Sequence, residues 1–590
     1  MLAVNTRRQF ILGGAAALAG SGVLIPGSAG ARIQRRRARL WARPDLLIPD
    51  ADQAAALRVL RRSQMRAPGS LPNPALKAGT DTIPQIEHVV VLMMENHSYD
   101  NFIGMLGRGP FQTPRGDGYT IAADGYPANS NPQADGTPLR AFHMPTTCQL
   151  SGKPSQEWTA SHQQYDNGKN DGFVTSPSGP VAMGYWTWAD LPFTYDLATQ
   201  FPIGDRYFCS VLGQTDPNRR YLIAATSSGM TDDVPSPSQD ATLAVTPPNG
   251  TIFSRLSNAG ISWAEYDVQY KDLTAETMNL YPSVDGAYDE TNERSFPQFL
   301  SDAKAGTLPS FSLIDPNFGT QSQENPQNIV VGEAFLRSVV EAIGSSPNWA
   351  KTILFINYDE HGGYYDHVPP PVALAPDNIP PVTSSPSQSA YDGFKRYGFR
   401  VPCIVVGPYA KPGYVSHVVY DHTSVLAFVE RKWNLPAMTM RDANANDMTD
   451  FLDLGAMSAG RPTFPELPQL AQSGDNEHTL MCSTTGPGVI PPSTQPAPLP
   501  IQIALDYGGI SKRDRGALVT VQASRGSLTG VSVELRRDGK VVARDRLARL
   551  TVVKREVVLR VRGKPPSPGE YTAFVVQGGR PLAHKTIEIR

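Results

Sequence analysis

Short, nearly continuous apolar runs recur along the larger, N-terminal part of the chain. They lie at Ile86–Met94, Phe311–Ile314, Ile353–Ile356 and Cys403–Val406. Such runs are typical of strands that are buried on both faces of a parallel sheet. Between them, apolar residues recur at helical spacing in 329–343, and in 424–433 behind Asp421 or Thr423 as a capping residue. The pattern predicts an α/β fold with a mostly parallel central sheet flanked by helices.

The C-terminal part of the chain shows a different pattern. Apolar and polar residues alternate in runs such as 531–536 and 556–561, and turn signals stand at Asp538-Gly539 and Pro568-Gly569. Short strands of period two separated by turns predict a small β-sandwich. We expect this module to be an accessory or stability domain. The proline-rich stretch 486–500 before it is typical of a semi-rigid linker.

An export signal is predicted at the N-terminus. Arg7-Arg8 precede a modest apolar run at 13–24, and Ala29-Gly30-Ala31 is a candidate cleavage site. The run is too short for a transmembrane helix, which needs roughly 20 apolar residues. We therefore expect a twin-arginine signal, no transmembrane anchor, and a secreted, periplasmic or cell-surface protein. The alternative is a basic tail with a chance apolar run.

Length and charge agree with a large soluble enzyme. The chain has 590 residues, a formal net charge of -2 and 40% hydrophobic residues. That length predicts two or more domains. The near-neutral balance argues against nucleic acid as a partner. The predicted organisation is a signal peptide (1–31), an N-terminal extension (32–81), a catalytic domain (82–485), a linker (486–500) and the β-sandwich (501–590).

Groups that can bind a metal follow three of the predicted strands. Glu95-Asn96, Asp315-Pro316-Asn317 and Asp359-Glu360-His361 each stand directly after an apolar run. The carboxyl ends of parallel strands lie along one edge of the sheet, where ligands bind. Any one of these segments alone is most often a turn. Together they predict a metal site. Carboxylate and amide oxygens suit a hard divalent cation, and imidazoles extend the choice to zinc.

Thr215 is the candidate nucleophile. It stands in the segment Gly213–Arg219. A hydroxyl becomes an effective nucleophile when a metal or a base assists its deprotonation. The alternative is that Thr215-Asp216-Pro217 only forms the turn that begins the following helix.

Several blocks of the sequence resemble the bacterial phospholipase C and acid phosphatase family of phosphoesterases. The blocks are 86–96, 213–219 and 358–371, with further similarity at 158–173, 183–193 and 420–424. They occur in order across most of the large domain. The resemblance implies an alkaline-phosphatase-like core that hydrolyses phosphate esters through a covalent phospho-enzyme.

The resemblance also implies roles for individual residues. Thr215 would be the nucleophile, and His162 and His361 would assist the leaving group or bind phosphate. The remaining assignments are Glu95, Asn96, Asp359 and Glu360 to one divalent metal ion, and Asn218, Arg219, His367 and His422 to substrate binding. Two positions depart from the family pattern. Asn325 replaces a His that members typically carry, and His97 replaces an Arg. The first departure bears on leaving-group protonation and substrate preference.

Three functional readings follow. The leading one is an exported, metal-dependent phospholipase C that hydrolyses phosphatidylcholine-type phosphodiesters through a phosphothreonine. The first alternative is a broad-specificity acid phosphatase acting on monoesters. The second is a non-catalytic surface binding protein on the same scaffold. The expected partner is a phospholipid or another phosphate ester. Tyr185, Trp186 and Trp188 are candidates for peripheral membrane contact, unless they pack in the core.

Overall fold

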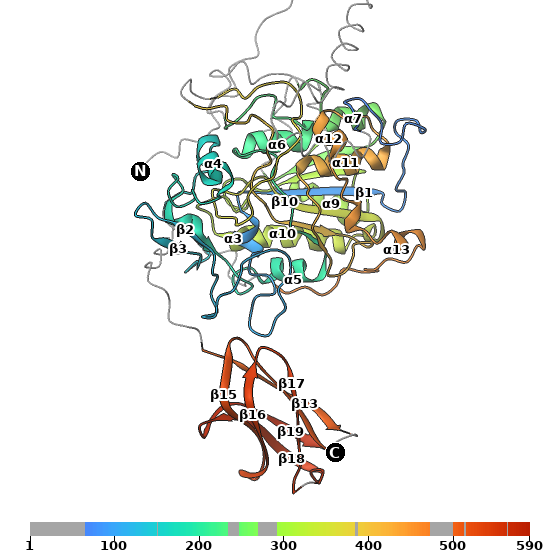
Figure 1. Ribbon diagram of the computed structural model, residues 1–590. Helices are drawn as coiled ribbons and strands as arrows, with labels where there is room; N and C mark the ends of the chain where they lie inside the picture. The colour runs from blue at the N-terminus through green and yellow to red at the C-terminus, as the bar shows by residue number, and fades with distance from the viewer. Residues whose placement is uncertain are drawn as a thin grey trace, which may run out of the picture. The chain divides into compact units, whose positions relative to one another are not determined.

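The computed structural model describes residues 65–149, 152–233, 247–268, 292–383, 388–472, 500–511, 515–562 and 564–590 (Figure 1). The predicted signal peptide, most of the N-terminal extension and the linker up to residue 499 lie outside these ranges. The chain forms two compact units. The domain boundaries near residues 485 and 501 stay predictions.

A mixed eight-stranded sheet lies at the centre of the larger unit. Its order is β12-β6-β11-β10-β1-β9-β7-β8. The strands are β1 (His88–Met94), β6 (Ile203–Gly204), β7 (Trp263–Asp267), β8 (Glu293–Ser295), β9 (Phe311–Asp315), β10 (Thr352–Tyr358), β11 (Cys403–Val406) and β12 (Val415–Ser416). The five strands from β10 to β8 run parallel, and β11 is antiparallel to both of its neighbours. The mostly parallel sheet predicted from the apolar runs is therefore confirmed.

Helices cover both faces of this sheet, as Figure 1 shows. On one side lie α6 (Thr215–Ala224), α7 (Ile252–Asn258), α11 (His422–Trp433) and α12 (Met440–Asn444). On the other lie α5 (Pro192–Gln200), α9 (Phe296–Ala305) and α10 (Ile329–Gly344). All residues of β10 and all but the first residue of β1 are buried. This double cover explains why these strands are continuous apolar runs.

The two helices predicted from periodicity begin at side-chain caps. Asn328 accepts a hydrogen bond from the amide of Val330 at the start of α10. Asp421 and Ser424 form a reciprocal capping box at the start of α11. Each cap satisfies backbone groups that the first helical turn leaves without partners.

Shorter elements form the loops of the larger unit. They are α3 (Tyr99–Ile103), α4 (Trp158–Tyr165), α13 (Leu454–Ser458) and the strand pairs β2 (Ser130–Pro132) with β3 (Pro138–Arg140), and β4 (Phe142–His143) with β5 (Gly184–Tyr185). Tyr185 and Trp186 are buried here, whereas Trp188 is 58% exposed. Within the described ranges, no helix has the length and apolar character needed to cross a bilayer.

The C-terminal strands form two antiparallel sheets. One has the order β13-β14-β17 and the other β16-β15-β18-β19. The strands are β13 (Ile503–Ser511), β14 (Gly516–Ala523), β15 (Ser527–Arg537), β16 (Lys540–Thr551), β17 (Arg555–Leu559), β18 (Gly569–Gln577) and β19 (Arg580–Ile589). Val519, Val533 and Val575 from both sheets share one buried core. The antiparallel strands predicted from the alternating pattern are confirmed.

Candidate active site

Strand register places two predicted site segments at one edge of the sheet. β1 pairs with β10 so that Met94 lies beside Tyr358, and the amide of Asp359 donates to the carbonyl of Met94 at 3.1 Å. The side chains that follow, Asn96 and Asp359, therefore leave the sheet together. This is the carboxyl edge of the parallel strands, where α/β proteins bind ligands.

The Thr215 hydroxyl lies at the same place. Thr215 is the first residue of α6 and is only 4% exposed. Its oxygen lies 3.2 Å from the side-chain nitrogen of Asn96, and its hydroxyl donates to the carboxylate of Asp359. The same Asn96 nitrogen lies 3.2 and 3.3 Å from the two Asp359 carboxylate oxygens. Three residues predicted for the site, from three separate segments, thus meet at one point.

Asn218 shapes the turn that carries Thr215. Its side-chain oxygen accepts from the amides of Ser210 and Val211 at 2.8 and 3.1 Å. Its nitrogen donates to the carbonyls of Gly213 and Gln214, both at 3.0 Å. These bonds engage both polar atoms of the side chain. The structure therefore places Asn218 behind the turn as a positioning residue.

The site holds more negative than positive charge. Arg219 is fully buried, 3.0 Å from Asp315, 3.6 Å from Asp359 and 3.8 Å from Glu95. Glu360 follows Asp359 and is also fully buried. Burial raises the pKa of Asp359. Burial and the neighbouring Asp359 raise the pKa of Glu360 well above its usual range. One guanidinium thus faces three carboxyl groups, and Glu360 adds a fourth beside Asp359.

This arrangement fits a divalent cation. Oxygen Oε1 of Glu360 is buried and accepts no hydrogen bond from the residues that the structure describes. A buried carboxylate oxygen in that state is costly unless a cation or a proton satisfies it. The donors are carboxylate and amide oxygens, which suit hard cations. Glu95, Asn96, Asp359 and Glu360 are therefore suitable ligands by charge and by chemistry.

The Asn96 amide also bears on this fit. As placed, its nitrogen faces Asp359 and its oxygen accepts from Gln156 Nε2 at 3.1 Å. Turning both amides by half a rotation presents the Asn96 oxygen to the Asp359 side and keeps the bond between Asn96 and Gln156. Gln156 can therefore support Asn96 either as a donor or as a metal ligand. No motif marked this glutamine in the sequence.

His361 lies beside the carboxylates. Its Nε2 is 2.7 Å from Gln164 Oε1, and its Nδ1 is 3.2 Å from Glu360 Oε2. Burial lowers the pKa of His361 to about 3. The neutral ring, donating to Gln164, turns the Nδ1 lone pair toward Glu360. A lone pair that faces a carboxylate oxygen is repulsive. A proton on Glu360 or a cation between Glu360 and His361 removes this repulsion.

His162 lies on α4, whose first residue is linked through Asp232 and Asp233 to the first turn of α6. The Trp158 amide donates to Asp232 at 2.6 Å, and the next residue, Asp233, accepts from the Asp216 amide at 2.8 Å. His162 Nδ1 donates to the Trp158 carbonyl at 2.7 Å, which leaves Nε2 as a proton acceptor. Its ring stacks on Tyr391 at 3.9 Å. Burial lowers the pKa of His162 to about 4.

His422 supports the backbone of Asp359. It is the first residue of α11, its Nε2 donates to the Asp359 carbonyl at 2.7 Å, and its Nδ1 is 3.2 Å from the Tyr207 hydroxyl. Burial lowers its pKa to about 3. A neutral His422 in this position holds the end of β10 in place.

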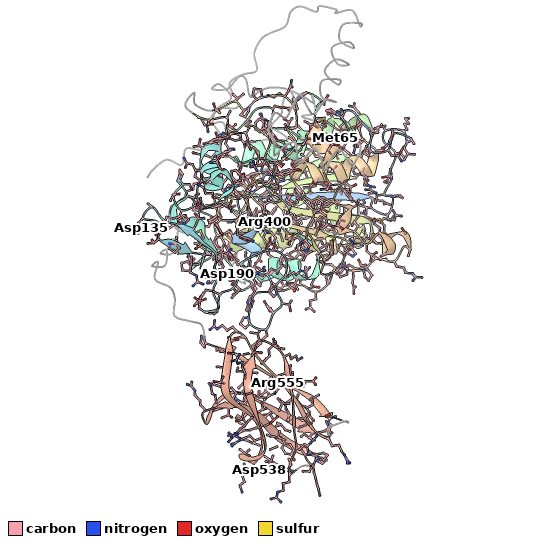
Figure 2. The ribbon with its side chains drawn as sticks, viewed as in Figure 1. Met65, Asp135, Asp190, Arg400, Asp538 and Arg555 are labelled. Atoms are coloured by element: carbon pink, nitrogen blue, oxygen red, sulfur yellow. The ribbon has the colours of Figure 1, made fainter. Side chains whose placement is uncertain are left out.

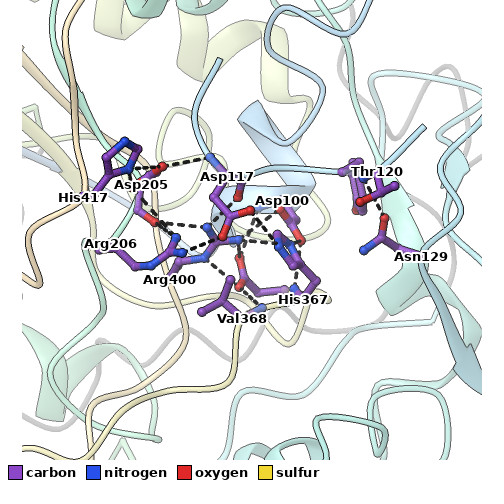
Figure 3. Close-up of polar contacts among 12 residues, drawn as sticks. Asp100, Asp117, Thr120, Asn129, Asp205, Arg206, His367, Val368, Arg400 and His417 are labelled. Atoms are coloured by element: carbon purple, nitrogen blue, oxygen red, sulfur yellow. Dashed lines mark hydrogen bonds and ion pairs between the residues drawn. The ribbon is translucent and has the colours of Figure 1, made fainter. Parts of the chain in front are cut away.

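His367 belongs to a separate cluster around Arg400 (Figure 3). Arg400 lies 3.1 Å from Asp100 and 2.8 Å from Asp366, and His367 Nδ1 lies 2.6 Å from Asp100. Asp100 and Asp117 offset the effect of burial and raise the pKa of His367 to about 10. The contacts continue through Asp117, Arg206 and Asp205. Figure 2 shows Arg400 inside the larger unit.

The same cluster contains a group that has the spacing of a metal site. Ligand atoms of Asp100, Asp366 and His367 lie within 4.8 Å of one another. However, Arg400 is fully buried against both aspartates, and His367 is itself cationic at neutral pH. The carboxylates therefore already have their countercharges. We regard this cluster as a link between loops. The assignment of His367, His422 and Asn218 to substrate binding stays a prediction.

Two glycines allow the chain to pass close over Asn96. Gly362 and Gly363 have φ of 66° and 74°. A Cβ on Gly362 would lie 1.9 Å from the Asn96 carbonyl oxygen, and one on Gly363 would lie 2.7 Å from the Ser155 backbone. Only glycine fits both the conformation and the space. Gly362 thus lets the segment after Asp359 pass against the segment of Asn96, and Gly363 lets it pass against Ser155.

The two departures from the family pattern lie in one neighbourhood. The Asn325 nitrogen donates to the Tyr364 hydroxyl at 3.1 Å. The His97 ring lies 2.7 Å from Asn101 Oδ1 and 2.8 Å from the Gln323 carbonyl, and it stacks on Phe102 at 3.8 Å. His97 therefore anchors the segment that leads to Asn325.

Comparison with known proteins identifies the family of the chain. The chain matches the model of the Phosphoesterase family over residues 86–436. It is 29% identical over 452 residues to Phospholipase C B of Mycobacterium tuberculosis, covering 67% of this chain and 84% of that protein. It is 30% identical over 444 residues to Hemolytic phospholipase C of Pseudomonas aeruginosa, covering 67% and 59%. It is 28% identical over 428 residues to Non-specific phospholipase C3 of Arabidopsis thaliana, covering 66% and 78%. Because the family model spans more than half of its length, the chain belongs to the Phosphoesterase family of phosphoric ester hydrolases.

Proposed function

We propose that this phosphoesterase is an exported, metal-dependent phospholipase C that cleaves phosphatidylcholine-type phosphodiesters through a phosphothreonine at Thr215. The observation that carries the proposal is the meeting of the Thr215 hydroxyl with Asn96 and Asp359. Similarity to phospholipases C supports the substrate class. An alkaline-phosphatase-like core is part of the same proposal. The N-terminal arginine pair and apolar run support export.

The reaction proceeds in two displacements at phosphorus. In the first, the Thr215 oxygen attacks the phosphodiester and its proton passes to Asp359. The bond between phosphorus and the diacylglycerol oxygen breaks, and that oxygen takes a proton from solvent water. In the second, water attacks the phosphothreonine and gives its proton to His162. The bond between phosphorus and the Thr215 oxygen breaks, Asp359 returns the proton to Thr215, and the phosphorylated head group is released. A divalent cation held by Glu95, Asn96, Asp359 and Glu360 would neutralise phosphate oxygens and favour deprotonation of Thr215.

Residues of α4 and α6 assist both displacements. α6 begins at Thr215, so the positive end of the helix dipole faces the phosphoryl group. His162 is neutral and keeps Nε2 as an acceptor, so we assign it the proton of the attacking water in the second step. Asn96 and Arg219 keep the nucleophile and Asp359 in place. Positioning and charge neutralisation supply most of the catalysis in phosphoryl transfer.

The direct test is product analysis on phosphatidylcholine with the purified, metal-loaded protein. We expect diacylglycerol and phosphocholine. Thr215→Ala should lower the rate on the order of 10³-fold or more, because the nucleophile is lost. Thr215→Ser keeps a hydroxyl and should retain measurable activity. Acid quenching of the wild type during turnover should trap a phosphorylated peptide that contains residue 215. Full activity of Thr215→Ala would overturn the proposal.

A broad-specificity phosphomonoesterase is the second candidate, because the imidazole missing at Asn325 bears on substrate preference. The same residue is the main support for the non-catalytic alternative. Rates on p-nitrophenylphosphocholine and p-nitrophenyl phosphate distinguish the two candidates. A phospholipase C prefers the diester, and an acid phosphatase prefers the monoester. The non-catalytic reading predicts neither activity, and the assembled set of Thr215, Asn96 and Asp359 argues against it.

A further inference from the structure

The formal charge of the chain is divided unevenly. Residues 501–590 contain 18 Lys and Arg against 8 Asp and Glu, a formal charge of +10. Because the whole chain carries -2, the remaining residues carry -12. The C-terminal sheets are thus strongly basic although the protein is almost neutral. Strong charge asymmetry of this kind indicates a partner of opposite charge.

Part of this positive charge gathers where β16 passes into β17. Residues 546–555 include Arg546, Arg549, Lys554 and Arg555 and no acidic residue. All four are exposed. Within the described part of the chain, none of the four forms an ion pair, whereas nearby Arg544 pairs with Glu534 at 2.6 Å. We call residues 546–555 the basic edge.

The basic edge also exposes apolar side chains. Val552 and Val553, in the connection between the two sheets, are 48% and 70% exposed. They directly precede Lys554 and Arg555. Exposed valine side chains are unfavourable in water. At a lipid surface, both the valines and the neighbouring cations are favourable. There, apolar side chains enter the interface and cations meet anionic head groups.

We propose that the basic edge docks the enzyme on the surface of a bilayer that contains anionic phospholipid. The choice of a lipid surface rests on the proposed function, in which the substrate lies in a membrane. The charge distribution and the exposed valines are independent of catalysis. The C-terminal sheets therefore act as a peripheral membrane-binding module. Each Lys or Arg held near an anionic surface strengthens binding by about fivefold.

Vesicle sedimentation with the full chain tests this proposal. The protein carries Thr215→Ala, so that lipid is not hydrolysed during the measurement. We expect binding to vesicles of phosphatidylcholine mixed with phosphatidylglycerol, weak binding to pure phosphatidylcholine, and loss of binding as salt is raised. Lys554→Glu with Arg555→Glu should weaken binding by about 30-fold or more. Val552→Ser with Val553→Ser should weaken it by about tenfold.

A matched charge reversal provides the control. Lys540 is the first residue of β16, whereas Thr551 is its last residue and lies in the basic edge. Lys564 comes after the end of β17. Figure 2 shows Asp538, beside Lys540 in the chain, toward the other end of this unit from Arg555. Lys540→Glu with Lys564→Glu changes the net charge equally and should retain binding within about threefold. Equal losses in both double variants would overturn the proposal, since net charge alone would then govern binding.

Two other results would also overturn the proposal. One is equal affinity for neutral and anionic vesicles. The other is tighter binding to DNA or heparin than to anionic vesicles, which would assign the basic edge to another polyanion. Hydrolysis of soluble p-nitrophenylphosphocholine by Lys554→Glu with Arg555→Glu in the active Thr215 background should equal that of the wild type. A wild-type protein that binds anionic vesicles but does not hydrolyse phosphatidylcholine would count against the proposed function only.

Discussion

The side-chain nitrogen of Asn96 lies 3.2 Å from the hydroxyl oxygen of Thr215, although the two residues are 119 positions apart in the chain. The contact joins the end of β1 to the start of α6. It gives Asn96 two tasks, because the same amide also contacts Asp359.

Asn96→Ala tests this double role. It removes both a proposed metal ligand and the group that orients the nucleophile, so kcat should fall on the order of 10²-fold or more. Gln156→Ala removes only the support behind Asn96 and should cost less. Steady-state kinetics on p-nitrophenylphosphocholine, with metal content measured in parallel, checks both. Unchanged kcat in Asn96→Ala would contradict the site.

Metal removal should expose the repulsion between Asp359 and Glu360. When a chelator removes the metal, we expect the phosphoesterase activity to be lost. Glu360→Gln should then melt above the wild type by about 2 °C or more, because it removes one of two adjacent buried carboxylates. With metal present, the order should reverse because the variant loses a ligand. Melting temperatures of the wild type and Glu360→Gln, measured with chelator and with metal, test this expectation. If Glu360→Gln melts above the wild type in both conditions, Glu360 is not a metal ligand.

Tyr391 should control the protonation of His162. The Tyr391 ring covers the imidazole at 3.9 Å, and burial lowers the pKa of His162 to about 4. Tyr391→Ala admits water and should raise that pKa toward its usual value of about 6.5. If His162 accepts the proton of the attacking water, the acid limb of the kcat profile moves to higher pH when hydrolysis of the phosphothreonine limits turnover. Tyr391→Phe keeps the stack and should leave the profile unchanged.

His367 should stabilise the fold in a pH-dependent way. Its pKa rises from 6.5 to about 10 in the folded chain because of Asp100 and Asp117. A raised pKa means that the folded state holds the proton more tightly. The stabilisation is therefore complete below about pH 6.5 and is lost as pH rises toward 10. The difference in melting temperature between wild type and His367→Gln should shrink across this window. A difference that is constant with pH would contradict the pairing.

Arg400→Met should destabilise the larger unit by about 3–5 kcal/mol, because it leaves Asp100 and Asp366 buried without their countercharge. Lys351→Ala breaks the 2.7 Å pair between Lys351 and Glu87, whose side chains are about half exposed. It should cost less than about 1 kcal/mol. Urea unfolding measures both. Adding Asp366→Asn to Arg400→Met should recover part of the loss.

The sequence revealed the strands better than their directions. β1, β9, β10 and β11 were readable because both faces of the sheet are covered. The antiparallel course of β11 was not readable, because an apolar run carries no direction. Asp359 and Glu360 were readable as polar groups at a strand end, whereas Thr215 needed the resemblance to stand out from an ordinary turn.

Partners were harder to predict than positions. Gln156 and Gln164 were not predicted as site residues because a single amide has no characteristic spacing in the sequence. Arg400 was not predicted because the two aspartates that it contacts lie in other parts of the chain. Asn218 and His422 were found at the right edge of the sheet. Sequence alone gave no sign that backbone groups engage both polar atoms of Asn218 and the Nε2 atom of His422.

The proposed metal site draws its ligands from the ends of β1 and β10, and the nucleophile from the start of α6 between them. A chain emerging from the ribosome therefore has no complete ligand set until residue 360 has been made and β10 has paired with β1. Partly folded chains should hold the cation weakly. Tight capture of the metal then marks the pairing of β1 with β10, and it separates chains that have formed this pairing from chains that have not.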